Sequence, residues 1–249
     1  MASRELRIRP LSGLPELREG DPLGRLIAEA ASPSAEEIVV ISQKAVSKAE
    51  GRLRRLTDVE PGPRALELAK GLGKDPALVE LVLAESARVV RAQRGVLITE
   101  TRAGWVCANA GIDSSNLGEG LVSLLPVDAD ESARRIRAEL RAASGASPAV
   151  VIADSFGRAW RLGQADVAIG CAGLDPLADW RGRRDAEGHE LSATVIAVAD
   201  ELASAADLSR DKDSRAPGAV VSGLAHLVTR DDGPGAASLR RSAAEDLFR

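Results

Sequence analysis

A carboxylate that directly follows a buried strand is the first feature of this chain with the potential for chemistry. Residues 149–153 form an uninterrupted apolar run, and Asp154 and Ser155 come next. A β-favouring run of this kind is typical of a strand that is buried on both faces. We therefore expect Asp154 at the end of a strand, where a carboxylate can hold a metal ion.

The residues after this carboxylate have anion-binding character. Arg158 and Arg161 lie close together, and each guanidinium offers a fork of N–H donors that matches a carboxylate or a phosphate. Glycines on either side of them would let the backbone approach a ligand closely. We expect a polar loop over 154–166 and a second apolar strand at 167–171.

A second polar cluster occupies residues 109–116, with the sequence Asn-Ala-Gly-Ile-Asp-Ser-Ser-Asn. The carboxylate of Asp113 and the hydroxyl and amide groups around it are hard oxygen ligands, which suit Mg²⁺ or Mn²⁺ beside nucleotide phosphates. An ordinary loop closed by Asx turns has the same composition. The cluster by itself leaves both interpretations open.

Two lysines complete this set of charged groups. Lys44 and Lys48 follow an apolar strand-like run and are four residues apart, so they share one face if the segment is helical. The solvated start of a helix would look the same. Together with Asp113 and Asp154, and with Asp166 in reserve, these cations suit phosphoryl transfer, which depends on positioning and charge neutralisation and needs no protein nucleophile.

Other kinds of chemistry have little support. His189 and His226 are the two histidines, neither lies in a nucleophile elbow, and they do not suffice for a zinc site. Cys107 and Cys171 occupy apolar runs without CxxC spacing, so we expect buried thiols in a reducing compartment. Residues 71–74 lack the earlier glycine and the Ser or Thr of a Walker A loop, and we expect them to end a helix.

The composition is that of a globular protein. With 249 residues, of which 45% are hydrophobic and 28% charged, the chain can bury a sizeable core. A net charge of −4 with alternating signs argues against a dedicated nucleic-acid or membrane-surface binder. The N-terminus is charged where a signal peptide is apolar, and the apolar runs are too short to cross a membrane, so we expect a cytoplasmic protein.

Strands and helices are both needed to position these residues. We expect strands at 6–9, 38–42, 87–91, 95–99, 104–108, 149–153, 167–171 and 219–222. We expect helices at 23–31, 63–70, 76–87, 128–143, 191–208 and 236–247. The fold class is therefore α/β (α+β), with mixed sheets and surrounding helices, and with no visible repeat, linker or domain boundary.

Four segments of the chain together resemble the coenzyme F(420)-0:γ-glutamyl ligase family. They occur in the family's order and extend over nearly the whole sequence, at residues 41–51, 107–116, 154–164 and 197–202. The family also occurs fused to a C-terminal nitroreductase-like domain. This chain ends before such a domain, so we expect the stand-alone form.

The resemblance implies a GTP-dependent ligase. Members add L-glutamate to the lactyl carboxylate of F(420)-0 and then to the γ-carboxyl group of the first glutamate, through an acyl phosphate. The resemblance also implies two divalent ions, Mg²⁺ or Mn²⁺, a monovalent cation such as K⁺, and a homodimer with an unusual α/β fold. We expect one family domain over 1–249, with two intertwined α/β subdomains as a possible division.

The site residues follow from the same resemblance, position by position. Asp113 and Asp154 would hold the first metal ion, and Ser155 and Asp211 the second, with Asp213 as the alternative to Asp211. The residues that would contact GTP are Leu14, Pro15, Glu16, Leu17, Gln43, Lys44, Lys48 and Asn116. Arg158 and Arg161 would bind a phosphate or a substrate anion and so take a catalytic role.

Two other functions use the same residues. A metal-dependent phosphohydrolase or phosphotransferase would employ Asp113, Asp154 and Arg158 without glutamate. A nucleotide- or deazaflavin-binding subunit that has lost catalysis would bind these ligands and turn nothing over. The dependence of GDP release on glutamate distinguishes the three.

Overall fold

A five-stranded sheet forms the centre of the computed structural model, which describes residues 5–211, 214, 216–242 and 244–246. The strands lie in the order β1-β12-β2-β8-β9. Only β2 and β8 are parallel, and the other neighbouring pairs are antiparallel. Their bounds are Arg7–Pro10 for β1, Gly218–Ser222 for β12, Ile38–Ser42 for β2, Ala149–Arg158 for β8 and Arg161–Ala172 for β9.

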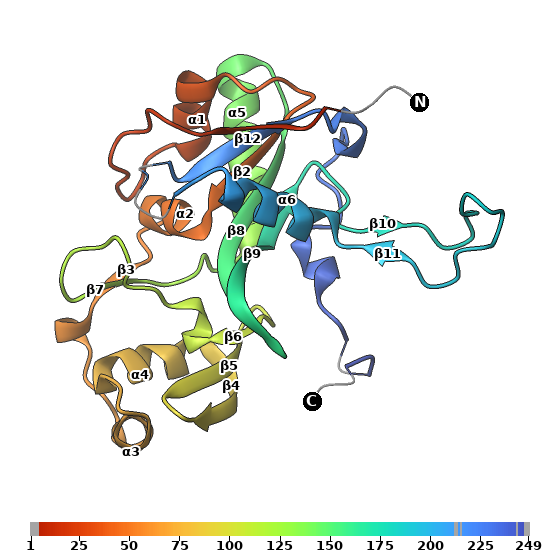
Figure 1. The fold of residues 1–249 in the computed structure, drawn as a ribbon. Helices are drawn as coiled ribbons and strands as arrows, with labels where there is room; N and C mark the ends of the chain where they lie inside the picture. The colour runs from red at the N-terminus through yellow and green to blue at the C-terminus, as the bar shows by residue number, and fades with distance from the viewer. Residues whose placement is uncertain (1–4, 212–213, 215, 243, 247–249) are drawn as a thin grey trace.

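Helices cover both faces of this sheet (Figure 1). Side chains alternate between the faces of a strand, so Val39 and Ile41 pack into one apolar cluster while Ile38 and Val40 pack into another. The first cluster includes residues of α1 and α5, and the second includes residues of α6. The helices are Leu23–Ala31 for α1, Ala129–Ser144 for α5 and Val198–Leu208 for α6.

A third apolar cluster belongs to an insertion between α2 (Gln43–Ala49) and α5, drawn in the lower part of Figure 1. Most of the insertion consists of two helices and an antiparallel meander, β4-β5-β6. The division of the chain into two intertwined subdomains stays a prediction. The elements of the insertion are β3 (Leu53–Arg55), η1 (Leu56–Asp58), α3 (Pro63–Leu72), α4 (Pro76–Ala84), β4 (Ser86–Gln93), β5 (Val96–Thr101), β6 (Val106–Ala108), η2 (Asn109–Gly111) and β7 (Leu121–Ser123).

The C-terminal part of the chain contains a narrow arm and two short turns. Strands β10 (Ala178–Asp179) and β11 (Val195–Ile196) pair at the base of the arm, which extends away from the sheet (Figure 1). The turns η3 (Ala225–Leu227) and η4 (Ala236–Leu239) follow α6 and β12. Within the described ranges, no helix has the length and apolarity to cross a membrane.

Much of the expected architecture is confirmed. The chain has a mixed α/β fold, and the helix at 23–31 and the strand at 38–42 have the bounds that their patterns predict. Cys107 and Cys171 are buried free thiols, and burial raises the pKa of each to about 12. Gly73 ends α3 in a left-handed conformation, with φ at 64°, as expected of a helix cap. The homodimer remains a prediction.

The polar loop expected over 154–166 is wrong. These residues continue β8 and β9 as a hairpin whose turn contains Trp160, with φ at 59°. The outer part of the hairpin lies beyond the apolar core and is exposed on both faces. Because no core face exists there, the strands carry no alternation of apolar and polar residues.

Three expected helix boundaries are also wrong. Residues 191–197 are not helical, and β11 occupies part of them because Val195 pairs with Asp179 of β10. The helix expected over 76–87 ends at Ala84, where the β4 strand takes over. The helix expected over 236–247 is reduced, in the described part, to the single turn η4.

Candidate active site

A cavity of about 690 Å³ opens where the parallel pairing of β2 with β8 ends. In the β2/β8 register Ser42 lies beside Ala153, so the start of α2 and the carboxylate of Asp154 reach the same edge of the sheet. Ligands of α/β proteins commonly bind at this edge. The cavity is lined by every described residue expected to bind GTP or metal: Leu14, Pro15, Glu16, Leu17, Gln43, Lys44, Lys48, Asp113, Asn116, Asp154, Ser155 and Asp211.

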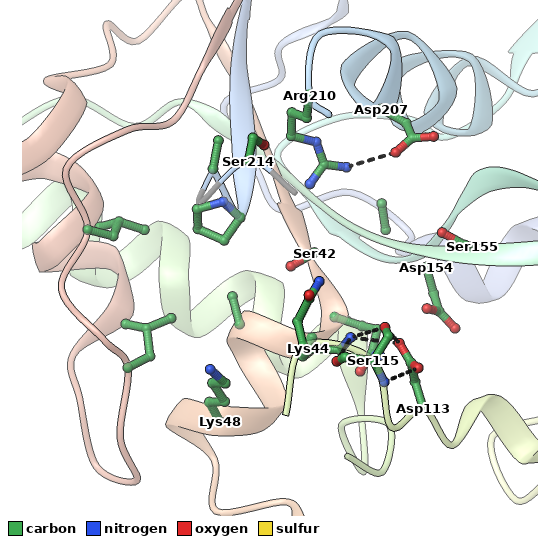
Figure 2. A pocket seen from close by; sticks show the side chains of 18 of the residues that line it. Ser42, Lys44, Lys48, Asp113, Ser115, Asp154, Ser155, Asp207, Arg210 and Ser214 are labelled. Carbon is green, nitrogen blue, oxygen red and sulfur yellow. Dashed lines mark hydrogen bonds and ion pairs between the residues drawn. The ribbon is translucent and has the colours of Figure 1, made fainter. Parts of the chain in front are cut away.

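Helix α2 directs both of its lysines into the cavity (Figure 2). Lys44 and Lys48 are one helical turn apart, as their spacing predicts. The hydroxyl of Ser47 donates to the backbone oxygen of Leu124 at 2.7 Å and lies 3.0 Å from Oε1 of Gln43, which is 2% exposed. These bonds fix α2 against the insertion and so set the positions of the lysines.

The loop that carries Asp113 begins with three successive left-handed residues, Asn109, Ala110 and Gly111. They reverse the chain so that Ile112 packs in the third apolar cluster and Asp113 faces the cavity. The Asp113 carboxylate accepts hydrogen bonds of 2.8 Å from both the backbone N–H and the hydroxyl of Ser115. The loop therefore closes an Asx turn and contributes to the cavity, so both interpretations of its composition hold.

Lys44 is paired with this loop in the structure. Its Nζ lies 2.7 Å from Oδ2 of Asp113, and it donates to the backbone oxygen and the hydroxyl of Ser115 at 2.6 and 2.7 Å (Figure 2). Burial would raise the pKa of Asp113, but the hydrogen bonds from Lys44 and Ser115 outweigh it and hold the pKa below its usual value. Asp113 is thus an anion with a cation beside it.

Asp154 differs from Asp113 in its electrostatics. Burial raises the pKa of Asp154 to about 7, and the negative charges of Asp166 and Asp113 act in the same direction. The backbone N–H of Ser155 and the charge of Lys44 oppose the increase. A divalent cation would relieve the repulsion among these carboxylates.

On the other side of β8, Ser155 belongs to a buried polar network. Its hydroxyl donates a hydrogen bond of 2.5 Å to Oδ1 of Asp166, the residue directly opposite on β9. Arg210, which follows α6, donates through Nη2 to Oδ2 of Asp166 at 3.0 Å. The same guanidinium lies 3.6 Å from Asp207 (Figure 2).

Arg210 and Asp207 line the cavity but were not expected from the sequence. They are three residues apart at the end of α6, where their spacing resembles that of a surface ion pair. The sequence alone presents Asp166 only as a further carboxylate. The β8/β9 pairing, which places Asp166 opposite Ser155, is the signal that would have found Asp166. Arg210 and Asp207 reach the cavity through the packing of α6 against β9, which has no local signal in the sequence.

A short loop, 14–17, forms the wall that faces the lysines. Leu17 is buried in the core, and Glu16 reaches across to Lys48, with 2.5 Å between Oε1 and Nζ. The loop is anchored next to the sheet, because the backbone N–H of Leu11 donates to the backbone oxygen of Gly218. In this structure both α2 lysines are therefore paired with carboxylates from other elements.

The structure does not bring Arg158 and Arg161 to the cavity. They pair with each other across the tip of the β8/β9 hairpin, and both are exposed. Arg158 donates through Nη2 to the backbone oxygen of Leu162 at 2.7 Å. Their expected role in binding an anion stays a prediction, and the lining of the cavity does not include them.

The loop between α6 and β12, residues 209–217 and here called the late loop, is described only in part. Asp211, the expected ligand of the second metal ion, lines the cavity together with Ser214. Asp213, the alternative, lies outside the described residues. Both described residues follow α6, so the end of this helix delivers the late loop to the cavity.

The donors in the cavity fit a divalent ion that is shared with a phosphate. Within the part of the chain that the structure describes, no three His, Cys, Asp or Glu side chains form a complete metal cage. Mg²⁺ is usually bound by one or two carboxylates together with water and substrate phosphates, and not by a dedicated protein cage. Asp113 and Asp154 match that pattern, and the ammonium group of Lys44 already stands beside Asp113 as a cation.

The chain is similar to known proteins over nearly its whole length. The profile of the F(420)-0:gamma-glutamyl ligase family matches residues 13–223. The chain is 44% identical to the coenzyme F(420):L-glutamate ligase of Methanopyrus kandleri over 246 residues, which are 98% of either chain. It is 42% identical to the protein of that name from Methanothermobacter thermautotrophicus, over 96% of this chain and 97% of the relative. It is 45% identical to the one from Halobacterium salinarum, over 85% of this chain and 84% of the relative. This chain belongs to the F(420)-0:gamma-glutamyl ligase family.

Proposed function

We propose that this protein is a GTP-dependent ligase that joins L-glutamate to coenzyme F(420)-0. The relatives that cover nearly the whole chain are named coenzyme F(420):L-glutamate ligases. The observation that carries the proposal is the composition of one cavity, in which the lysines of α2 face the carboxylates of Asp113 and Asp154. That is the set of charges needed to activate a carboxylate with a nucleoside triphosphate.

The two lysines would bind the phosphates of GTP. Lys44 and Lys48 each lie with an Nζ within 2.7 Å of a carboxylate oxygen, so each presents its charge to the cavity and not to the solvent. A phosphate that enters must take over at least one of these pairings. The wall formed by 14–17, with Gln43 and Asn116, would hold the remainder of the nucleotide.

Asp113 and Asp154 would hold the first divalent ion, Mg²⁺ or Mn²⁺, and Ser155 and Asp211 the second. When bound, such ions neutralise the charge that builds up on the phosphoryl oxygens. The raised pKa of Asp154 supports this assignment, because a buried carboxylate next to two others favours a positive partner. The resemblance to the family is the only support for a monovalent cation such as K⁺.

The proposed reaction has two displacements. A carboxylate oxygen of F(420)-0 attacks the γ-phosphorus of GTP, the bond to the β-phosphate oxygen breaks, and GDP leaves with the electron pair. The amine of glutamate then attacks the carbonyl carbon of the acyl phosphate, phosphate leaves, and the nitrogen loses a proton. Residues of the cavity contribute by holding the reacting groups in line and by excluding competing water.

Several finer features belong to the same proposal. We propose a second addition, to the γ-carboxyl group of F(420)-1, and a homodimer as the working form. The exposed hairpin tip that bears Arg158 and Arg161 is one surface on which a second copy could complete the site. Two buried free thiols agree with a reducing, cytoplasmic compartment.

A coupled assay tests the proposal. The protein is incubated with GTP, Mn²⁺, L-glutamate and F(420)-0, and GDP and the product mass are followed together. The proposal predicts one GDP for each glutamate added, no GDP when F(420)-0 is left out, and at most one GDP for each active site when glutamate is left out. GDP release that ignores glutamate would identify a phosphohydrolase or phosphotransferase, and binding of GTP and F(420)-0 without turnover would identify a non-catalytic subunit.

A further inference from the structure

The strongest feature that the proposed chemistry leaves unused is the carboxylate of Asp166. Its side chain is 5% exposed, and it lies on β9 directly opposite Ser155 of β8. Oδ1 accepts the Ser155 hydroxyl at 2.5 Å, and Oδ2 accepts Nη2 of Arg210 at 3.0 Å. Because both oxygens already serve as acceptors, Asp166 is arranged to hold its neighbours.

The hydrogen bond to Asp166 determines how Ser155 can act. A serine hydroxyl has one proton and two lone pairs. Because the Ser155 hydroxyl donates its proton to the Asp166 carboxylate, Oγ of Ser155 can interact with a further group only as an acceptor. The short, charge-assisted hydrogen bond also increases the partial negative charge on Oγ. Both effects favour a cation on the cavity side of the oxygen and disfavour an anion.

Arg210 holds the Asp166 carboxylate in the orientation that this arrangement requires. The Arg210 side chain is 9% exposed and lies against Asp166, with its Nε also donating to the backbone oxygen of Ala206. The pair is thus buried and held in one geometry.

Asp154 and Ser155 lie on opposite faces of β8, as neighbours on a strand do. In Figure 2 the Asp154 carboxylate points toward Asp113, whereas Ser155 lies on the side of Arg210 and Asp207. Any cation at Ser155 is therefore distinct from one shared by Asp113 and Asp154. The hydrogen bonds of Asp166 act on the second position, and Asp154 experiences only the charge of Asp166.

We propose that Asp166 is a positioning residue, which orients the Ser155 hydroxyl as a ligand for a divalent cation and is itself held by Arg210. This inference rests on the proposed function for the presence of two divalent ions. It adds a residue that does not touch the ion and that acts through another side chain. Second-layer partners of this kind typically change metal affinity by about 10- to 100-fold.

A double-mutant cycle with Mn²⁺ as the probe tests the proposal. Mn²⁺ is titrated into metal-free protein, alone and with GDP, and the free ion is measured by electron paramagnetic resonance. Asp166→Asn and Ser155→Ala should each weaken the binding of one of two Mn²⁺ ions by about 10- to 100-fold, and change the binding of the other ion much less. The double variant should bind as weakly as Ser155→Ala and no more weakly, because Asp166 acts through Ser155.

Controls separate this role from simple loss of stability. Asp200 is a half-buried carboxylate on α6 that accepts the backbone N–H of Ala168, so Asp200→Asn removes a comparable group without touching Ser155. Its Mn²⁺ affinities should match those of the wild type. Should Asp166→Asn fold poorly, Asp166→Leu with Arg210→Met removes both buried charges together, and that variant should still lose the second ion.

Three results would overturn the proposal. They are wild-type Mn²⁺ affinity in folded Asp166→Asn, a further loss when Asp166→Asn is added to Ser155→Ala, and binding of only one Mn²⁺ by the wild type. Failure of the proposed function looks different. The wild type could bind two Mn²⁺ ions and the variants could give the expected double-mutant cycle, while GDP release does not depend on glutamate. That result would support the role of Asp166 and contradict the proposed ligase activity.

Discussion

Lys44 Nζ lies 2.7 Å from Oδ2 of Asp113, so a residue expected to bind phosphate is paired with a residue expected to bind metal. The ammonium group occupies a position beside Asp113 that a divalent ion would also favour. If the protein binds metal and GTP as proposed, the two should therefore be coupled. An ion at Asp113 would release Lys44, and the released lysine would then be available to a phosphate.

This pairing makes Lys44→Met informative in two directions. Loss of a charged hydrogen bond, about 1.5–3 kcal/mol, should weaken GTP binding by roughly 10- to 150-fold. Affinity for Mn²⁺ in the absence of nucleotide should rise, because the competing ammonium is gone. Calorimetric titration of each ligand measures both effects.

Lys48→Met is the matched control for that variant. Lys48 is on the same face of α2 but pairs with Glu16, which lies in the wall of the cavity. Its loss should weaken GTP binding and leave the Mn²⁺ affinity unchanged. Equal Mn²⁺ affinity in Lys44→Met and the wild type would contradict the competition between Lys44 and metal.

Asp154 should make the stability of the metal-free protein fall as the pH rises. Its pKa is about 7 in the folded protein, against an ordinary value of 3.8 for an Asp carboxyl group, so the folded state holds the proton more tightly. The resulting stabilisation is complete below about pH 4 and is lost as the pH rises through 7. The difference between the two pKa values corresponds to at most about 4 kcal/mol in the free energy of unfolding.

Asp154→Asn removes this dependence. Urea unfolding in the presence of a chelator should show that the variant is more stable than the wild type at pH 8 and closer to it at pH 5. The same variant should release no GDP in the coupled assay, since it loses a metal ligand. Parallel pH profiles for the two proteins would show that the Asp154 carboxyl is not buried as the structure has it.

Gly111 should tolerate no side chain. Its φ is 73°, and a Cβ there would lie 2.6 Å from a methyl group of Leu125. Gly120 has a φ of 71° but open space around it. In both alanine variants, backbone strain should lower the free energy of unfolding by about 1–2 kcal/mol. Overpacking should lower it by about 1–3 kcal/mol more in Gly111→Ala. Thermal unfolding of the two variants measures the difference, and equal melting temperatures would argue against the packing of Leu125 on this turn.

Arg158 and Arg161 should not affect binding of GTP or Mn²⁺ by a single chain. They lie at the hairpin tip and do not line the cavity. We expect Arg158→Ala and Arg161→Ala to keep both affinities within about twofold, the range typical of exposed substitutions. A tenfold loss of GTP affinity in either variant would mean that the hairpin reaches a nucleotide site, most simply that of a second copy.

The sequence predicts the parts of the fold that have a clear apolar period. The run at 38–42 is buried on both faces and the pattern at 23–31 is amphipathic, and both elements have the expected bounds. The hairpin beyond Asp154 has no such pattern because it leaves the core. Irregular register within the hairpin also hides the pairing, since the strands shift between Gly157 and Arg158.

The candidate site could be predicted only in part for the same reason. Asp113, Asp154 and the lysines stand out because charged residues follow apolar strands. The contribution of Arg210 depends on how α6 packs against β9, and that packing is a tertiary contact with no local signal. Asp166 could be recognised once Ser155 is known to lie opposite it, which requires the register of β8 and β9.

The fate of one oxygen atom tests the central claim most directly. F(420)-0 is labelled with ¹⁸O in its lactyl carboxylate and converted by the wild-type protein with GTP, Mn²⁺ and L-glutamate. Activation as an acyl phosphate transfers one labelled oxygen from the carboxylate to the phosphate that is released, and mass spectrometry of that phosphate should detect it. Phosphate without the label, formed together with the glutamylated product, would contradict the account.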